Sequence, residues 1–250
     1  MSKIEDHRRD WEDLGELDPL WAVLSDPARK FGKWPLEEFF HTGEEEVRGI
    51  LSLAAKLHCP YQRHRALDFG CGVGRITRAL SPYFTHCYGV DVSEQMVNNA
   101  KELNSFATNC EFIVNKESNL ERFPDGYFDF ITSRLVLQHL PRRTLALSYI
   151  AEFVRTLVPG GLLVFQMPTH IPLRNRVQLR RRAYRVLKKL GLNSSFLYNF
   201  LGLHPVRMIS LSRERVLSHI CKEKGRVLLF TPDEFPSGVQ LRSNTYFISK

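Results

Sequence analysis

The chain has 250 residues, of which 43% are hydrophobic and 25% are charged. A chain of this size builds one good-sized core with additions, and it is too short for two full domains. It opens with charged residues and has no apolar run long enough to span a bilayer, so we expect a cytoplasmic protein without a signal peptide. Its five cysteines are scattered and form no C-x-x-C pair, which indicates reduced thiols and no metal site.

The positive charge is concentrated in one segment, residues 174–189. The formal net charge is +8, and this basic segment contains eight cationic residues and no acid. These are Arg174, Arg176, Arg180, Arg181, Arg182, Arg185, Lys188 and Lys189. Subtracting these eight from the 35 Lys and Arg residues leaves 27, which equals the number of Asp and Glu residues. The rest of the chain is therefore neutral, and the net charge alone does not indicate a nucleic-acid-binding protein.

The first part of the chain, from about residue 10 to residue 57, has a helical pattern and carries all three tryptophans. The residues Thr42-Gly43-Glu44-Glu45 are similar to a capping box at the start of a helix. We therefore expect residues 1–60 to form an N-terminal helical cap.

From Arg65 onward, short apolar runs alternate with helical stretches, which predicts a parallel α/β sheet. The five predicted strands lie in residues 66–69, 87–91, 111–114, 128–132 and 162–166. The alternation of strands and helices ends after Met167, and residues 168–212 are predicted to form an inserted, basic, helical lid. A further helix, residues 212–224, precedes two strands at 226–230 and 244–248, joined by a link with Pro232, Pro236 and Gly238. We expect these strands to form an antiparallel edge pair, and residues 61–167 and 213–250 to form the core domain.

The glycine-rich segment between the first predicted strand and the next helix carries the functional argument. It contains Gly70, Gly72 and Gly74, and the next strand ends at Asp91, 19 residues after Gly72. Glycines allow a tight turn and close approach of a ligand, and a carboxylate at the end of the second strand is placed to accept the ribose hydroxyls of a nucleoside.

Three features argue against a dinucleotide such as NAD. The third glycine comes one residue early for G-x-G-x-x-G, the fingerprint position holds Arg75, and Asp68 precedes the turn. A carboxylate beside the turn would repel a pyrophosphate, whereas it suits a ligand with an ammonium and a sulfonium centre.

With these residues the sequence resembles the class I S-adenosylmethionine (SAM)-dependent methyltransferases, whose first motif is an acidic residue followed by G-x-G-x-G. The resemblance spans residues 65–167 and the last strands, and it includes Gly89-Val90-Asp91-Val92-Ser93, Phe123-Pro124-Asp125-Gly126, Leu135-Val136-Leu137-Gln138-His139-Leu140 and Leu157-Val158-Pro159-Gly160-Gly161. It implies an α/β, Rossmann-like, seven-stranded sheet of order 3-2-1-4-5-7-6 with an antiparallel last strand. It also implies SAM as cofactor and S-adenosyl-L-homocysteine (SAH) as product.

The resemblance assigns candidate site residues by position. Asp68, Gly70, Gly72 and Gly74 are expected to hold the methionine part, and Asp91 the ribose. Val92, Met96, Asn115 and Leu120 are expected around the adenine, with Asn115 in place of the acid that the family often has after strand three. Arg134 is expected to line the cleft, and Thr42 and Gly43, at a helix N-terminus, to approach the cofactor carboxylate. His139 is the candidate general base for an acceptor hydroxyl.

The acceptor is not identified by these motifs, because methyl transfer needs mainly alignment and exclusion of water. We expect a small-molecule, sugar, lipid or peptide acceptor, as in specialised biosynthesis. Two hypotheses stand for the lid. In one, Ala183, Val186, Leu187 and Leu190 form an apolar stripe that packs on the core, as a lid or a homodimer element. In the other, Arg180, Arg181 and Arg182 attract an anionic substrate or a membrane surface.

Three alternative functions stay open. RNA methylation using the basic lid ranks lower, since the chain after strand four reads Thr132-Ser133-Arg134-Leu135 and lacks an N/D-P-P-Y/F-like tetrad. A SAM-binding scaffold would bind the cofactor without turnover. An aminopropyltransferase-like enzyme would need acidic residues for a polyamine, which the basic segment does not supply.

Overall fold

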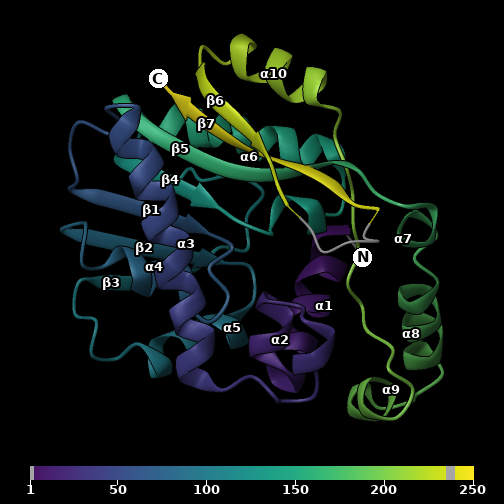
Figure 1. The fold of residues 1–250 in the computed structure, drawn as a ribbon. Helices are drawn as coiled ribbons and strands as arrows, with labels where there is room; N and C mark the ends of the chain where they lie inside the picture. Colours follow the sequence, from purple (N-terminus) through teal and green to yellow (C-terminus); the bar gives the residue numbers. More distant parts are fainter. Residues whose placement is uncertain (1–2, 235–239) are drawn as a thin grey trace.

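A computed structural model describes residues 3–234 and 240–250, except for the side chains of Lys3 and Arg174. Its centre is a seven-stranded sheet of order β3-β2-β1-β4-β5-β7-β6 (Figure 1). The strands are β1 (Arg65–Phe69), β2 (His86–Asp91), β3 (Cys110–Val114), β4 (Phe128–Ser133), β5 (Leu157–His170), β6 (Arg226–Pro232) and β7 (Arg242–Ser249). Strands β1 to β5 are parallel, and β7 lies antiparallel between β5 and β6. The predicted fold class and strand order are confirmed, as is the antiparallel pairing of the last two strands.

Helices cover both faces of this sheet. The helical elements are α1 (Lys3–Leu17), α2 (Pro19–Val23), the 3-10 turn η1 (Pro27–Arg29), α3 (Leu36–Lys56), α4 (Arg75–Leu80), α5 (Glu94–Leu103), the 3-10 turn η2 (Leu137–His139), α6 (Arg143–Thr156), α7 (Leu173–Val177), α8 (Leu179–Lys189), α9 (Ser194–Asn199) and α10 (Arg213–Lys222). Apolar residues of α3 and α4 pack on one face, and those of α6 and α10 pack on the other. Every residue of the central strand β4 is buried as a result.

Strand β5 is longer than the sequence indicates. It continues to His170, because Pro168 and His170 still pair with β7. The lid therefore begins at Ile171 rather than at residue 168. The predicted turn at Pro236 and Gly238, between β6 and β7, lies outside the described residues.

The predicted helix start at Thr42 is wrong. Helix α3 begins at Leu36, directly after Pro35, and has Glu37 and Glu38 in its first turn. Thr42 lies inside the helix, where its hydroxyl donates to the carbonyl oxygen of Phe39 at 2.6 Å. Acidic residues in the first turn favour the earlier start, and the threonine hydroxyl is satisfied by the preceding turn instead of by capping.

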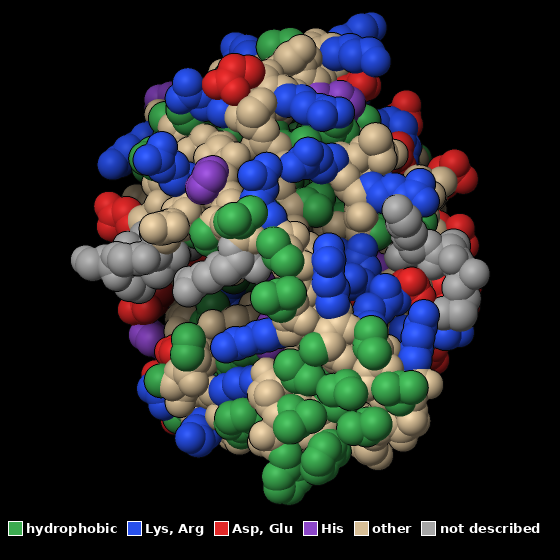
Figure 2. Space-filling model, turned by 90° about the vertical axis from the view of Figure 1, so that its right-hand side faces the viewer, with side chains coloured by type: hydrophobic (Ala, Val, Ile, Leu, Met, Phe, Trp, Pro, Cys, Tyr) green, Lys and Arg blue, Asp and Glu red, His purple; other side chains and the backbone are tan. Residues whose placement is uncertain are grey.

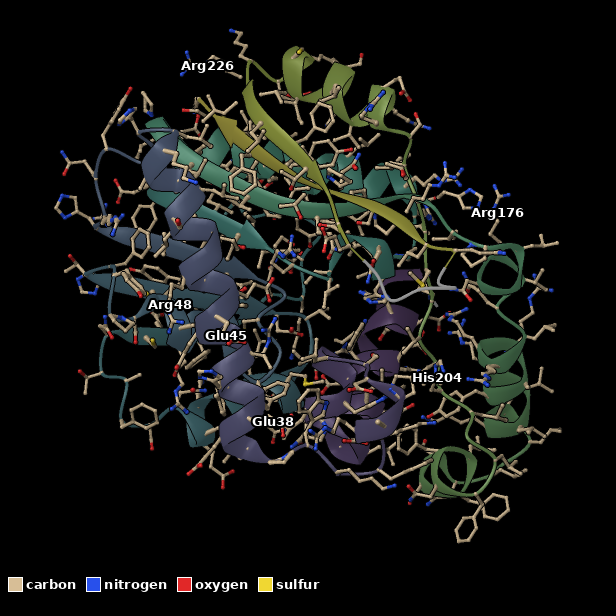
Figure 3. The ribbon with its side chains drawn as sticks, in the orientation of Figure 1. Glu38, Glu45, Arg48, Arg176, His204 and Arg226 are labelled. Atoms are coloured by element: carbon tan, nitrogen blue, oxygen red, sulfur yellow. The ribbon has the colours of Figure 1, made fainter. Side chains whose placement is uncertain are left out.

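The lid, residues 171–212, contains α7, α8 and α9 and lies beside α1 (Figure 1). The prediction that the apolar stripe of α8 packs on the core is wrong for two of its residues, since Val186 is 57% exposed and Leu190 is 72% exposed. Tyr184 is buried on the other side of the same helix. Figure 2 shows hydrophobic side chains gathered on this side of the molecule, and Figure 3 shows Arg176 on the lid, across the molecule from Arg48 on α3.

Candidate cofactor and acceptor site

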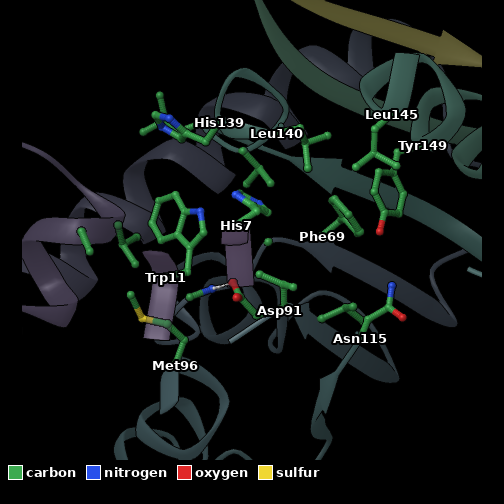
Figure 4. Close-up of a pocket in the computed structure, with 18 of the residues that line it drawn as sticks. His7, Trp11, Phe69, Asp91, Met96, Asn115, His139, Leu140, Leu145 and Tyr149 are labelled. Atoms are coloured by element: carbon green, nitrogen blue, oxygen red, sulfur yellow. Dashed lines mark hydrogen bonds between the residues drawn. The ribbon is translucent and has the colours of Figure 1, made fainter. Parts of the chain in front are cut away.

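A cavity lies at the carboxyl ends of β1, β2, β3 and β4, and we call it the cofactor cavity. It encloses about 810 Å³, counting the part open to solvent. The chain connections from β1 and β4 run to opposite sides of the sheet, and α/β folds bind ligands at such a switch point. Its lining residues come from the N-terminal helices and from the segments that follow β1 to β4 (Figure 4): Ile4, His7, Trp11, Ala22, Val23, Phe69, Gly70, Gly72, Val90, Asp91, Val92, Met96, Asn115, Glu117, Arg134, Leu135, Val136, His139, Leu140, Leu145 and Tyr149.

The glycine turn after β1 forms the floor of this cavity. Gly70 and Gly72 have φ angles of +78° and +52°, a region that side-chain-bearing residues rarely adopt. A Cβ atom on Gly72 would lie 2.3 Å from Cγ2 of Val23, so α2 packs directly on the turn. Gly74 caps the N-terminus of α4 and does not line the cavity. Two of the three predicted glycines therefore lie at the site, and the third shapes the helix behind it.

Asp91 is the carboxylate at the end of β2, and it lies in the cavity beside this turn. Its Oδ2 accepts from the backbone N–H of Gly72 at 2.9 Å, and its Oδ1 accepts from that of Ser93 at 3.0 Å. Burial raises the pKa of Asp91 above its ordinary value, while these backbone donors oppose the rise. A carboxylate oxygen can accept a further hydrogen bond, so both oxygens keep capacity for a pair of hydroxyl groups.

The side of the cavity next to β2 and β3 is lined by Val92, Met96, Asn115 and Glu117. The Asn115 side chain donates to the carbonyl oxygen of Asn119 at 2.9 Å, which fixes the loop after β3. The sequence prediction missed Glu117, an acidic residue two positions further along this loop. Leu120, which was expected at the adenine, is buried in the main core and does not line the cavity.

Asp68 lies behind the glycine turn and is not among the residues that line the cavity. Its Oδ2 accepts from the hydroxyl of Thr77 on α4 at 2.7 Å. Burial raises the pKa of Asp68 to about 7, although the Thr77 hydroxyl opposes this. This carboxyl group links β1 to α4 across the turn. The expected contact between Asp68 and the ammonium group of the cofactor stays a prediction.

A charge network joins the cavity to α3, and its central residue, Glu46, was missed by the sequence prediction. Glu46 accepts from Nη2 of Arg75 at 2.6 Å and from Nε of Arg134 at 2.6 Å. Arg134 lines the cavity and also donates to Thr245 on β7. Burial acts to raise the pKa of Glu46, yet the two guanidinium groups together hold it below its ordinary value.

Thr42 and Gly43 do not line the cavity. Gly43 lies against Arg75, because a Cβ atom there would be 2.6 Å from the Arg75 carbonyl oxygen. Both residues are inside α3, so no free helix N-terminus approaches the cofactor from this side. Thr42 likewise contacts Arg75, whose Nη1 donates to its hydroxyl at 3.3 Å.

Three aromatic rings of α1 and η2 form the wall opposite β2 (Figure 4). His139 on η2 lies edge-on to Trp11 of α1, with ring centres 5.5 Å apart, and Trp11 in turn contacts His7. Nδ1 of His139 lies 2.6 Å from the carbonyl oxygen of Arg207 and must therefore carry the proton. Burial lowers the pKa of His139 to about 4 and that of His7 to about 3. Both imidazoles are neutral near pH 7.

The remaining wall of the cavity is apolar. It is formed by Phe69, Val136, Leu140 and Leu145, together with the ring of Tyr149, whose hydroxyl donates to the carbonyl oxygen of Glu117 at 2.8 Å. The contribution of α1 was the main omission of the sequence prediction. The sequence signal that could have revealed it is the cluster of tryptophans before the sheet. The prediction placed these tryptophans in the N-terminal cap and did not assign them to the site.

The comparisons with known proteins agree with this geometry. Residues 67–165 match a family described as a methyltransferase domain. The chain is 34% identical over 124 residues to the uncharacterized methyltransferase YcgJ of Bacillus subtilis, covering 48% of this chain and 46% of that protein. It is 31% identical over 168 residues to a ubiquinone biosynthesis O-methyltransferase of Methylococcus capsulatus, covering 66% of this chain and 59% of that protein. The chain thus spans about half the length of these curated relatives.

Solved structures share the fold across the whole chain. A SAM-dependent methyltransferase from Leishmania major superposes with a TM-score of 0.66 at 14% identity, covering 99% of this chain and 83% of that one. Magnesium protoporphyrin IX methyltransferase from Synechocystis PCC 6803, solved with bound SAH, superposes with a TM-score of 0.63 at 17% identity and covers 100% of both chains. Residues 67–165 thus form a methyltransferase domain, and the chain as a whole has the fold of the SAM-dependent methyltransferases.

Two further properties concern the described part of the chain, residues 3–234 and 240–250. None of its helices is both long enough and apolar enough to cross a membrane. It also contains no group of three or more His, Cys, Asp or Glu side chains placed to hold a metal ion.

Proposed function

We propose that this protein transfers a methyl group from SAM, held in the cofactor cavity, to a small-molecule acceptor, and releases SAH. The observation that carries the proposal is the Asp91 carboxylate, which lies in the cavity and is fixed to the glycine turn by the Gly72 N–H at 2.9 Å. The match of residues 67–165 to a methyltransferase domain supports the same reaction.

The residues around the cavity fit SAM. Asp91 would accept the two ribose hydroxyls, while Val92, Met96 and Asn115 would surround the adenine, with the Asn115 amide as its polar contact. Gly70 and Gly72 let the backbone approach the methionine part, and the Arg134 guanidinium supplies a cation for its carboxylate. We assign Asp68 to support of the turn through Thr77.

The chemistry that bound SAM supplies is a methyl carbon activated by a positively charged sulfur. The protein's own contribution is then to align the acceptor with that carbon and to exclude water. Trp11 and His7 cover the cavity from α1, and Tyr149 and Leu145 close it from α6. The apolar character of this wall favours an acceptor with an apolar or aromatic body. Among the acceptors expected from the sequence, which are small molecules, sugars, lipids and peptides of specialised biosynthesis, those with an apolar or aromatic body fit this wall best.

His139 is better suited to positioning the acceptor than to removing its proton. A general base works best when its pKa is near the working pH, whereas burial lowers the pKa of His139 to about 4. Its Nε2 also lies 3.1 Å from the side-chain nitrogen of Gln138, which can donate to it. An acceptor that loses its proton to solvent would not need this histidine as a base.

Calorimetric titration with SAM, SAH and NADH tests the cofactor assignment. We expect micromolar binding of SAM and SAH, no binding of NADH, and loss of binding in Asp91→Ala. The matched control is Glu102→Ala, an exposed acid on α5, which should bind like the wild type. Binding of NADH instead of SAM, or full SAM affinity in Asp91→Ala, would refute the proposal.

An activity screen separates an enzyme from a SAM-binding scaffold. SAH release would be measured with hydroxyl- and amine-bearing acceptors that have aromatic or aliphatic bodies. SAM binding without SAH release across the panel, or release only with RNA, would favour the corresponding alternative. RNA is disfavoured because Arg181, Arg185 and Lys188 of the basic segment form ion pairs with α1.

A further inference from the structure

Helix α8 of the lid packs on the protein through its charged side. At about 100° of rotation per residue, Arg181, Arg185 and Lys188 share one side of the helix, and Leu179, Val186 and Leu190 share the opposite side. The charged side faces the protein, and the apolar side is exposed. This is the reverse of the usual arrangement of a surface helix in a globular protein.

The inner side of α8 pairs with a row of acids on α1. Arg181 contacts Asp10 at 3.0 Å, Arg185 contacts Asp6 at 2.7 Å, and Lys188 donates to Asp13. The hydroxyl of the buried Tyr184 also donates to Asp13, at 2.9 Å. These contacts fix the orientation of the helix, so its apolar side cannot turn toward the core without breaking them.

The lid carries a group of exposed apolar side chains, which we together call the outer face. Leu179 is 68% exposed, Leu190 is 72% exposed and Phe200 is 78% exposed. The complete set is Leu173, Leu179, Val186, Leu190, Phe196, Phe200 and Leu201. The rings of Phe196 and Phe200 stack on each other in the open, with their centres 5.3 Å apart. Exposed apolar side chains that gather on one side of a protein, as Figure 2 shows here, indicate an interaction site.

Exposed cations border the outer face. Arg180 lies on one flank of the apolar stripe of α8, and Arg182 and Lys189 lie on the other. Among the described residues, no carboxylate lies within 4.0 Å of any of the three, unlike the inward cations of the same helix. Figure 2 shows Lys and Arg side chains beside the gathered hydrophobic ones.

We propose that the outer face docks on the surface of an anionic lipid bilayer. An interfacial helix inserts an apolar stripe at the level of the acyl chains and keeps Lys and Arg at its flanks for the anionic headgroups, which is the arrangement that α8 presents. A second copy of the chain fits less well, because a two-fold contact through the outer face would place the cations of one copy against those of the other. The proposal does not depend on methyl transfer.

Co-sedimentation of the full chain with vesicles tests this docking. Vesicles of phosphatidylcholine would be compared with vesicles that also contain about 30% phosphatidylglycerol. We expect binding only to the anionic vesicles, with a fall of about tenfold or more in the partition coefficient for Leu179→Ser/Leu190→Ser and for Arg180→Glu/Arg182→Glu.

Matched control variants reverse the same number of charges, or remove an exposed apolar side chain, outside the lid. Arg48→Glu/Lys101→Glu changes the net charge by the same four units on the exposed surfaces of α3 and α5, and Phe106→Ser removes a ring that is 63% exposed. Both controls should bind vesicles like the wild type. Circular dichroism and SAM titration show that each variant is folded independently of its lipid binding.

Three results would overturn the proposal. The first is absence of vesicle binding by the wild type. The second is equal binding with and without the anionic lipid, or equal losses in the lid variants and the controls. The third is a dimer, seen by light scattering, that Leu179→Ser/Leu190→Ser converts to monomer, since the outer face would then be a subunit interface.

Discussion

Replacing Glu46 by glutamine tests the charge network that joins α3 to the cofactor cavity. In the native protein its carboxylate is shared between Arg75 and Arg134, at 2.6 Å from each. The Arg75 side chain is only 4% exposed, so Glu46→Gln leaves a buried guanidinium without its counter-charge. Breaking a buried pair in this way costs about 3–5 kcal/mol. The Glu46 side chain is 22% exposed, and the glutamine oxygen can still accept one hydrogen bond, so we expect a loss of about 2–3 kcal/mol.

This loss should appear in thermal denaturation at pH 7 as a fall in Tm of about 5–10 °C for a chain of this size. The pKa of Glu46 is held below its ordinary value in the folded protein. Its contribution is therefore present above the unfolded pKa of about 4.3 and is lost as the pH falls through the lower folded pKa. The difference between wild type and Glu46→Gln should accordingly narrow below about pH 4.

The neighbouring residue provides the matched control. Glu45 is 62% exposed, and its carboxylate lies 3.4 Å from the His41 ring at the surface of α3. Glu45→Gln should change the free energy of unfolding by less than about 0.5 kcal/mol. A Tm for Glu46→Gln that equals that of Glu45→Gln, or a difference that stays constant down to acidic pH, would refute the reasoning.

Three further predictions concern the turn, the cavity wall and the lid. Gly72→Ala forces a side chain into a left-handed backbone and against α2, which should cost about 1–2 kcal/mol and lower SAM affinity about tenfold, as measured by calorimetry. His139→Gln should flatten the pH dependence of urea unfolding. The neutral imidazole stabilises the fold above about pH 6.5, and this contribution of about 2–3 kcal/mol is lost as the pH falls toward 4. Asp10→Asn removes a carboxylate that three arginines share, two of them mostly buried, and should cost about 1–3 kcal/mol in the same assay.

Each of these three has its own control or opposing result. Gly49→Ala adds a methyl group within α3 where no atom lies within 4 Å, so it should not destabilise. A fall of a hundredfold or so in kcat/KM for His139→Gln, with loss of a pH-rate step, would restore the general-base role. Asp125→Asn breaks a pair whose acid is 79% exposed and should have almost no effect on unfolding.

The strands and the glycine turn could be predicted because their signals are local, whereas the strand order was implied by the family resemblance. Alternating apolar runs define the strands, and the motif from Asp68 to Gly74 occupies one turn between a strand and a helix. The position of Asp91 followed from its spacing. These features depend on residues that are close in sequence, so composition and period carry the information.

The parts that could not be predicted depend on contacts between distant segments. Periodicity showed that α8 is amphipathic, but the side that faces the protein is set by Asp6, Asp10 and Asp13, about 170 residues earlier in the chain. Glu46 is likewise separated from Arg134 by 88 residues. A pattern of one segment does not reveal which charges on another segment neutralise it.

Helix α1 carries the cavity on one side and the lid on the other. His7 and Trp11 face the cavity, while Asp10 and Asp13 hold the inner side of α8. A force that draws α8 outward therefore acts on the same short helix that covers the ligand. If binding of the lid to its partner shifts α1, it changes the affinity of the cavity for its ligand. Coupling between two sites is reciprocal, so a ligand in the cavity then changes the affinity of the lid for its partner by the same factor.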